Sequence, residues 1–211
     1  MLIVQTCVCC HTTYYLLQKV IQQFEMFTSQ ASKGGPSPLN ALTIVLLGIW
    51  TLANTETFRQ IADRFDVAKS TAHDVSGDLC RVLNHCLPMY VQWPTVAEMG
   101  DIAEAFENRT GFPGAVGAID GCHVPIKKPM ENTEGYYNRK KFFSINLLAI
   151  VDHRMAFRHV HVGWPGSVHD ARVYRNSPVY DILTDNSLPQ HLHVIGDCIS
   201  TIYLTACTIS R

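Results

Sequence analysis

Three apolar segments of the sequence end in an aspartate or run directly into one. Asp120 closes GAVGAID, Asp170 follows MAFRHVHVGWPGSVH, and Asp197 closes HLHVIGD. In open α/β sheets ligands collect at strand ends, and magnesium prefers a few carboxylates together with waters. Two such ions can activate a water and stabilise the leaving oxygen of a phosphodiester. The acids therefore predict a metal site for phosphodiester chemistry, although each taken alone also suits a turn or helix cap.

Basic residues cluster after the first acid. Lys127 and Lys128 follow HVPI, and the segment YYNRKK contains Arg139, Lys140 and Lys141. Aromatic residues next to a basic triplet suit binding to a phosphate backbone or to stacked bases. An ordinary solvated loop explains the same residues equally well, and the sequence leaves both interpretations open.

Other polar residues near the acids have weaker signals. His169 precedes Asp170 and is either a ligand or orienting group for the acid or a solvated turn histidine. Asp152 also follows a strand, but it lies in the tight turn DHR, so we expect a structural role. Cys122 has no obvious base beside it, which argues against a nucleophile.

The second half of the sequence has the pattern of strands that could position these acids. Four apolar segments predict strands, at 114–120, 142–152, 155–164 and 191–197. The segment 171–183 is helical until Ser177 and Pro178 interrupt it. Three strands, a helix and a further strand predict an α/β fold with a mixed sheet and helices packed on it.

The first half has helical spacing instead. Phe58, Ile61, Ala62 and Phe65 fall on one helical face, and Thr57 with Gln60 fits a capping box before them. The segment DVAKS makes a short turn, and a second apolar face runs over 72–83. Two short helices joined by a tight turn indicate a helix-turn-helix.

A helix-turn-helix would expose Lys69, Ser70 and Thr71 at the start of its second helix, where DNA is read. An ordinary helical hairpin remains the alternative. Asp74 has the wrong charge for a phosphate, and Gly77 weakens the helix by about 1 kcal/mol relative to alanine.

Composition bounds the remaining possibilities. The 211 residues are 47% hydrophobic and 17% charged, which is enough apolar material for a core. The net charge of −1 gives no global attraction to nucleic acid, so DNA contacts must come from local patches. The longest apolar run, 41–53, is shorter than the roughly 20 residues of a membrane span, and no membrane partner is expected.

The patterns along the chain predict four parts. They are a helical segment at 1–38, a helix-turn-helix-like helical domain at 39–95, a linker helix at 96–113 and a partial nuclease domain at 114–211.

Three long strings, in order, resemble the Harbinger (PIF/Harbinger) transposase group, which includes a domesticated transposase-derived nuclease. They are GFPGAVGAIDGCHVPIKKP, YYNRKKFFSINLLAIVD and VGWPGSVHDARVYRNSPVYDIL. The segment TETFRQIADRFDVAKSTAHDV also resembles the helix-turn-helix segment of that family. The resemblance covers roughly 35–197.

The resemblance implies a DDE endonuclease with a ribonuclease-H-like fold that cleaves DNA with Mg²⁺ or Mn²⁺. Asp120 matches the first catalytic acid, Asp170 the next acid of the motif, and Asp197 a further acidic position. Fold topology favours Asp197 as the second metal ligand, and the family motif favours Asp170. The resemblance also implies DNA contacts by the basic loop, a Myb-like partner protein, and location in the nucleus, with the cytoplasm as a second site.

The sequence departs from the family after Asp197. The family continues with an aromatic, proline-containing segment and a helical region carrying the catalytic glutamate, whereas here no glutamate follows Glu134. The ribonuclease-H-like sheet is therefore expected to be incomplete, and little or no cleavage is expected. Asp66 also stands where the family's helix-turn-helix usually has glycine.

Three hypotheses follow. The first is a transposase-derived nuclease, C-terminally truncated, that cleaves DNA phosphodiester bonds. The second is a non-catalytic DNA-binding or partner-binding protein that uses the helical domain. The third is a non-functional reading frame whose product does not fold stably.

Overall fold

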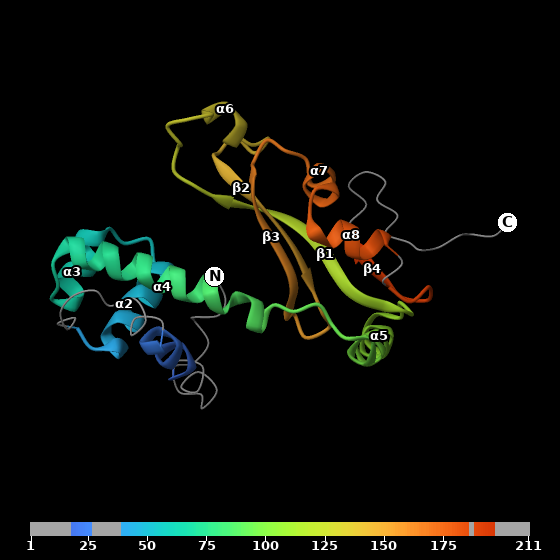
Figure 1. The fold of residues 1–211 in the computed structure, drawn as a ribbon. Helices are drawn as coiled ribbons and strands as arrows, with labels where there is room; N and C mark the ends of the chain where they lie inside the picture. The colour runs from blue at the N-terminus through green and yellow to red at the C-terminus, as the bar shows by residue number, and fades with distance from the viewer. Residues whose placement is uncertain (1–17, 27–38, 186–187, 197–211) are drawn as a thin grey trace. The chain divides into compact units, whose positions relative to one another are not determined.

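The computed structural model describes residues 18–26, 39–185 and 188–196 (Figure 1). The chain divides into two units, Met1–Met89 and Tyr90–Arg211, which are described separately here. Among the described residues, none of the helices combines the length and the apolar character needed to cross a membrane.

The first unit is helical throughout its described part. A helix at residues 18–26 precedes α2 (Ala41–Ala53), α3 (Phe58–Phe65) and α4 (Lys69–Tyr90). The predicted capping box is confirmed, because the Thr57 side chain accepts from the Gln60 amide and the Gln60 side chain accepts from the Thr57 amide. Gly48 lies against Leu79 so closely that a Cβ atom would overlap its side chain, which makes α2 and α4 pack without a gap.

A three-residue turn joins α3 to α4. Its first residue, Asp66, has left-handed backbone angles, φ 51° and ψ 52°. The amide groups of Asp66 and Val67 both donate to the carbonyl of Ala62, which closes the end of α3. Glycine adopts this conformation freely, but a residue with a Cβ does so at a cost of about 1 kcal/mol.

The second unit is built on a four-stranded sheet. Its strands are β1 (Ala115–Pro125), β2 (Ser144–Val151), β3 (Phe157–Pro165) and β4 (His193–Gly196), and their order is β3-β2-β1-β4. β2 is antiparallel to both β1 and β3, and β4 runs parallel to β1. The predicted α/β fold with a mixed sheet is confirmed in this form.

The first strand is longer than the sequence predicts. The expectation that it ends at Asp120 is wrong, because pairing with β2 continues from Ala118 to Pro125. The partner on its other side is shorter, since β4 pairs with β1 only as far as Ile119, opposite Gly196. Asp120 is therefore an interior strand residue at the position where one edge of β1 loses its described partner.

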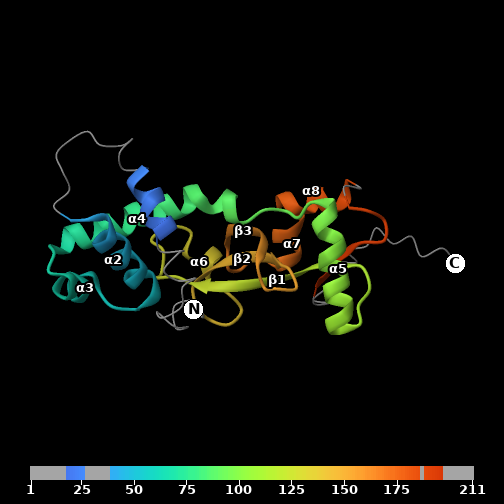
Figure 2. The ribbon, with the colours of Figure 1, turned by 90° about the horizontal axis from the view of Figure 1, so that it is seen from below.

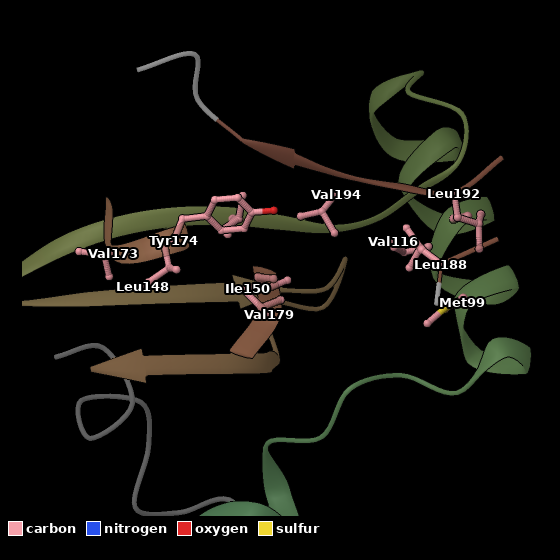
Figure 3. Packing of buried hydrophobic residues seen from close by; sticks show 12 residues of the cluster. Met99, Val116, Leu148, Ile150, Val173, Tyr174, Val179, Leu188, Leu192 and Val194 are labelled. Atoms are coloured by element: carbon pink, nitrogen blue, oxygen red, sulfur yellow. The ribbon is translucent and has the colours of Figure 1, made fainter. Parts of the chain in front are cut away.

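Two short helices, α7 (Asp170–Arg175) and α8 (Pro178–Thr184), pack on one face of the sheet. The interruption at Ser177 and Pro178 is confirmed, since Pro178 begins α8. Buried side chains from the helices and the sheet form one core (Figure 3), which includes Leu148, Ile150, Val173, Tyr174 and Val179.

A longer helix, α5 (Val96–Thr110), lies at the start of β1 (Figure 2). It begins with a capping box between Thr95 and Glu98 and ends at Gly111, which has a φ of 77°. A single turn, α6 (Thr133–Tyr136), lies between β1 and β2. The middle of β1 lies next to the start of α7, where Gly121 faces Asp170.

Candidate functional site

Asp120 lies in β1 just beyond the last described pair with β4. It is exposed, and its Oδ1 accepts the amide proton of Gly121 at 2.7 Å. That amide lies beyond the last residue pair between β1 and β4, so no described strand takes it. The Asp120 side chain therefore provides the acceptor for this backbone amide through Oδ1, and its Oδ2 has no hydrogen-bond partner among the described residues.

Asp170 reaches the same edge from the helix-covered face of the sheet. A Cβ atom on Gly121 would lie 2.7 Å from the Asp170 Cγ and 2.8 Å from its Oδ1. Only glycine leaves room for the Asp170 carboxylate to rest against the strand. Because successive strand residues alternate between faces, Asp120 and Asp170 flank this edge from two sides. We call Asp120, Gly121 and Asp170 the acid corner.

Neither Asp120 nor Asp170 forms an ion pair with any residue that the structure describes. Within the same ranges, no three His, Cys, Asp or Glu side chains are grouped for a metal. Mg²⁺ is commonly held by one or two carboxylates, with waters or substrate phosphates completing its shell. Asp120 and Asp170 offer two carboxylates of this kind, one from each side of β1 beside Gly121.

Cys122 lies two residues beyond Asp120 and is exposed. Partial burial raises the pKa of its thiol above the ordinary value, and the nearby charges of Asp120 and Asp170 raise this pKa further. The thiol therefore stays protonated at neutral pH, which agrees with the expectation that it is no nucleophile.

A buried asparagine fixes the loop that carries Asp170. The Asn146 Nδ2 donates to the carbonyl of Val168 at 2.7 Å and to that of Pro165 at 3.4 Å. The amide of Gly166 donates to the carbonyl of Ser144, so the loop is tied to β2 at several points. The sequence analysis missed Asn146, whose only signal is a polar residue inside the apolar run SINLLAIV.

The predicted basic residues Arg139, Lys140 and Lys141 lie in a tight turn between Tyr137 and Phe143, which form an antiparallel bridge. All three basic side chains are exposed. The structure brings one of them to the acid corner, because the Arg139 Nη2 lies 2.8 Å from the Nδ1 of His169, the residue before Asp170.

The other predicted residues lie elsewhere. Lys127 and Lys128 are exposed in the loop after β1, and no described contact joins them to the acid corner. Lys69 and Ser70 are exposed at the start of α4, whereas Thr71 is half-buried. Asp197 lies outside the described residues, and the structure therefore does not test its predicted role.

Comparison with known proteins gives concordant results. Residues 119–200 match the family model described as "DDE superfamily endonuclease". The chain is 27% identical over 171 residues to "Protein ALP1-like" of Arabidopsis thaliana, covering 80% of this chain and 42% of that protein. It is 25% identical over 185 residues to "Putative nuclease HARBI1" of Rattus norvegicus, covering 87% and 51%. These matches confirm the resemblance to Harbinger transposase-derived nucleases.

The chain spans about half the length, or less, of the curated relatives it matches. The human protein of the same name, for example, is 25% identical over 165 residues, which are 78% of this chain and 46% of that protein. No solved structure gives a significant match.

Proposed function

We propose, from the similarity of this chain to the Harbinger transposase-derived nucleases, that its sheet unit is a nuclease domain for metal-dependent cleavage of DNA phosphodiester bonds. The observation that carries the proposal is the acid corner. Two carboxylates that form no ion pair with the described residues flank one strand edge, and a glycine provides the space for one of them. A structural role would favour compensated acids, because uncompensated charges in proximity repel each other.

In this proposal, Asp120 and Asp170 hold a divalent cation, Mg²⁺ or Mn²⁺, with Asp197 as a further ligand. The chemistry that such a cation would supply is activation of a water and stabilisation of the leaving oxygen of a phosphodiester. The lack of a side chain at Gly121 leaves room for the Asp170 carboxylate against β1. Asn146 fixes the loop from which Asp170 projects. The exposed Arg139, Lys140 and Lys141 bind the DNA backbone beside these acids, with Lys127 and Lys128 extending the basic surface.

We further propose a ribonuclease-H-like fold for the sheet unit. Its support is the strand order β3-β2-β1-β4, with three antiparallel strands followed by a parallel one. The residues before Asp197 and Asp120, namely Gly196 and Ile119, are paired, which supports this proposal.

Mn²⁺ binding tests the proposal most directly, since little or no cleavage is expected from the sequence. The full chain should bind Mn²⁺ by isothermal titration or by electron paramagnetic resonance. Asp120→Asn and Asp170→Asn should each weaken binding by at least tenfold, because each removes a charged ligand. Asp181→Asn, which changes an exposed acid on α8, is the matched control. Equal affinities in all four proteins would exclude a metal site at the acid corner.

Plasmid nicking is the second measurement. Any Mn²⁺-dependent nicking by the full chain should be abolished by Asp120→Ala and retained by Asp181→Ala. Nicking that survives Asp120→Ala would come from a contaminating nuclease or from another site, and would contradict the assignment of Asp120 as a catalytic acid.

A second candidate function is binding of DNA or of a partner protein through the helical unit. It is favoured by the exposed start of α4, which follows a three-residue turn in the manner of a helix-turn-helix. A Myb-like partner and nuclear location belong to this proposal. In a gel shift with duplex DNA, Lys69→Ala and Ser70→Ala should weaken binding by the full chain, with or without a basic partner. Unchanged binding would rule out the recognition role of α4.

A further inference from the structure

The contact between Arg139 and His169 joins the basic turn to the acid corner. The guanidinium of arginine carries only donors, so the Nδ1 of His169 must accept this hydrogen bond. The two residues are 30 positions apart, and both side chains are exposed. Burial of the two side chains therefore does not explain their contact. The backbone segments that carry them must place them within hydrogen-bond distance.

The backbone on the arginine side is well fixed. Asn138 is buried, donates from its side chain to the Ser144 hydroxyl at 2.7 Å, and accepts the Phe142 amide at 3.3 Å. Lys141 has a φ of 66°, a conformation that a residue with a Cβ adopts at an energetic cost. The turn thus projects Arg139 from a defined position.

The histidine side is fixed to the same elements. The Ser167 amide donates to the Gly135 carbonyl at 3.1 Å, and the Asn146 side chain donates to the Val168 carbonyl. His169 follows directly, and Asp170 rests against Gly121. Arg139 and Asp170 are consequently held by turns that are tied to the same strand and to each other.

The charge of Arg139 is left available by this arrangement. Its described partner is an uncharged ring nitrogen, and it makes no ion pair within residues 39–185. His169 uses one donor of the guanidinium, and the remaining donors are free for an anion. A phosphate needs such a fork of donors, and a carboxylate in place of the histidine would neutralise it.

We propose that His169 is a positioning residue that holds the Arg139 guanidinium beside the acid corner, where Arg139 binds a phosphate of the DNA backbone. The inference rests on the proposed function and adds a residue to it. His169 acts by limiting the freedom of a long side chain before DNA arrives. An ordered side chain loses less entropy on binding, which corresponds to about a 2- to 10-fold gain in affinity.

The test is a set of DNA affinities measured by fluorescence anisotropy with the full chain and a duplex of mixed sequence. Arg139→Ala should weaken binding by about 10-fold and lower the slope of log K against log salt concentration by about 0.9, the value for one lost phosphate contact. His169→Ala should weaken binding by about 2- to 10-fold. The double variant should bind like Arg139→Ala alone, because His169 acts only through the arginine.

His169→Asn is the matched rescue variant, since its Oδ1 presents an acceptor at nearly the position of the histidine Nδ1. It should restore most of the affinity that His169→Ala loses. A His169→Ala protein with full affinity, or losses from the two single variants that add in the double variant, would overturn the inference. Thermal unfolding of each variant separates a folding defect, which His169→Asn need not rescue, from the loss of a positioned arginine.

The result also distinguishes the inference from the proposed function. If the triple variant Arg139→Ala, Lys140→Ala, Lys141→Ala binds DNA as tightly as the parent chain, the inference fails together with the proposed DNA contacts of the basic turn, while Mn²⁺ binding still tests the acid corner separately. If the triple variant binds weakly while His169→Ala binds fully, DNA binding by the turn stands and only the role of His169 is wrong.

Discussion

The turn between β2 and β3 and the acid corner both contain aspartates at the periphery of the same sheet, yet the two regions treat their carboxylates differently. Asp152, in the turn, is buried, and its Oδ1 accepts the amides of Arg154 and Ala156. Its Oδ2 accepts from the Nε of Arg158 at 2.9 Å. The expected structural role of Asp152 is confirmed.

At the acid corner, by contrast, Asp120 accepts only the adjacent amide of Gly121, and Asp170 has no ion pair in the described part of the chain. A carboxylate whose oxygens are all used stabilises the fold and has nothing left for a ligand. One whose oxygens are free adds little to the fold and can bind a cation. The number of hydrogen bonds that a carboxylate already accepts therefore distinguishes a structural aspartate from a candidate ligand. Its position after a strand does not.

The largest effect should come from Asp152→Ala. The change leaves two amides and the Arg158 guanidinium without their acceptor in a buried setting, which should lower the free energy of unfolding by about 3 kcal/mol. Urea denaturation measures it. Asp120→Ala is the matched control and should change the stability by less than about 0.5 kcal/mol. Equal losses from both variants would remove the distinction between the two regions.

The pH dependence of stability should show part of the same effect. Burial by itself raises the pKa of Asp152, but the hydrogen bonds from Ala156, Arg154 and Arg158 outweigh it and hold this pKa below its usual value. The folded state therefore binds the proton less readily than the unfolded chain. The stabilisation is present above the usual aspartate pKa of about 4 and is lost as the pH falls through the lower, folded-state pKa.

Unfolding measured between pH 6 and pH 2 should accordingly show a loss of stability at acid pH that is smaller in Asp152→Asn. Glu56 and Glu98 also have lowered pKa values, because their carboxylates accept hydrogen bonds, first of all from Arg64 and Thr95. Glu56 has no described contact with Asp152, whereas Glu98 shares Arg158 with it. The difference between the two curves therefore reports Asp152 together with its effect on this shared arginine. Parallel curves would contradict the assignment.

Gly121→Ala should separate binding from stability at the acid corner. The new methyl group must displace the Asp170 carboxylate, which can move because it ends a side chain near the surface. We expect Mn²⁺ affinity to fall by about tenfold, with a change in the free energy of unfolding below about 1 kcal/mol. Gly100→Ala, on α5 where no atom lies within 4 Å of the new Cβ, is the control and should keep full affinity.

The smallest effect should come from Asp66→Gly, which asks whether an unpaired acid alone marks a metal site. Asp66 is exposed and forms no ion pair with the described residues, and it is not part of any group of potential metal ligands among them. Because its φ is 51°, glycine should stabilise the chain by about 1 kcal/mol in thermal or urea unfolding. Mn²⁺ affinity should not change, and a reduced affinity would mean that metal binds at the turn instead.

Much of the fold followed from local patterns. The capping box at Thr57, the break at Pro178 and the four strands were each predictable, since they depend on residues that are neighbours in sequence. The end of β1 was not, because the continuation from Asp120 to Pro125 depends on pairing with β2, some 25 residues later. Hydrophobicity alone cannot show that a half-exposed segment remains in a sheet.

The candidate site divides in the same way. The sequence by itself determined which residue types could bind a cation or a phosphate: Asp120 and Asp170, and the cluster Arg139–Lys141. Only the tertiary structure decided that Asp170 rests on Gly121, that Arg139 reaches His169, and that Asp152 is saturated. The chemistry of a side chain is fixed by its covalent structure, whereas its availability depends on the partners that the folded chain places around it.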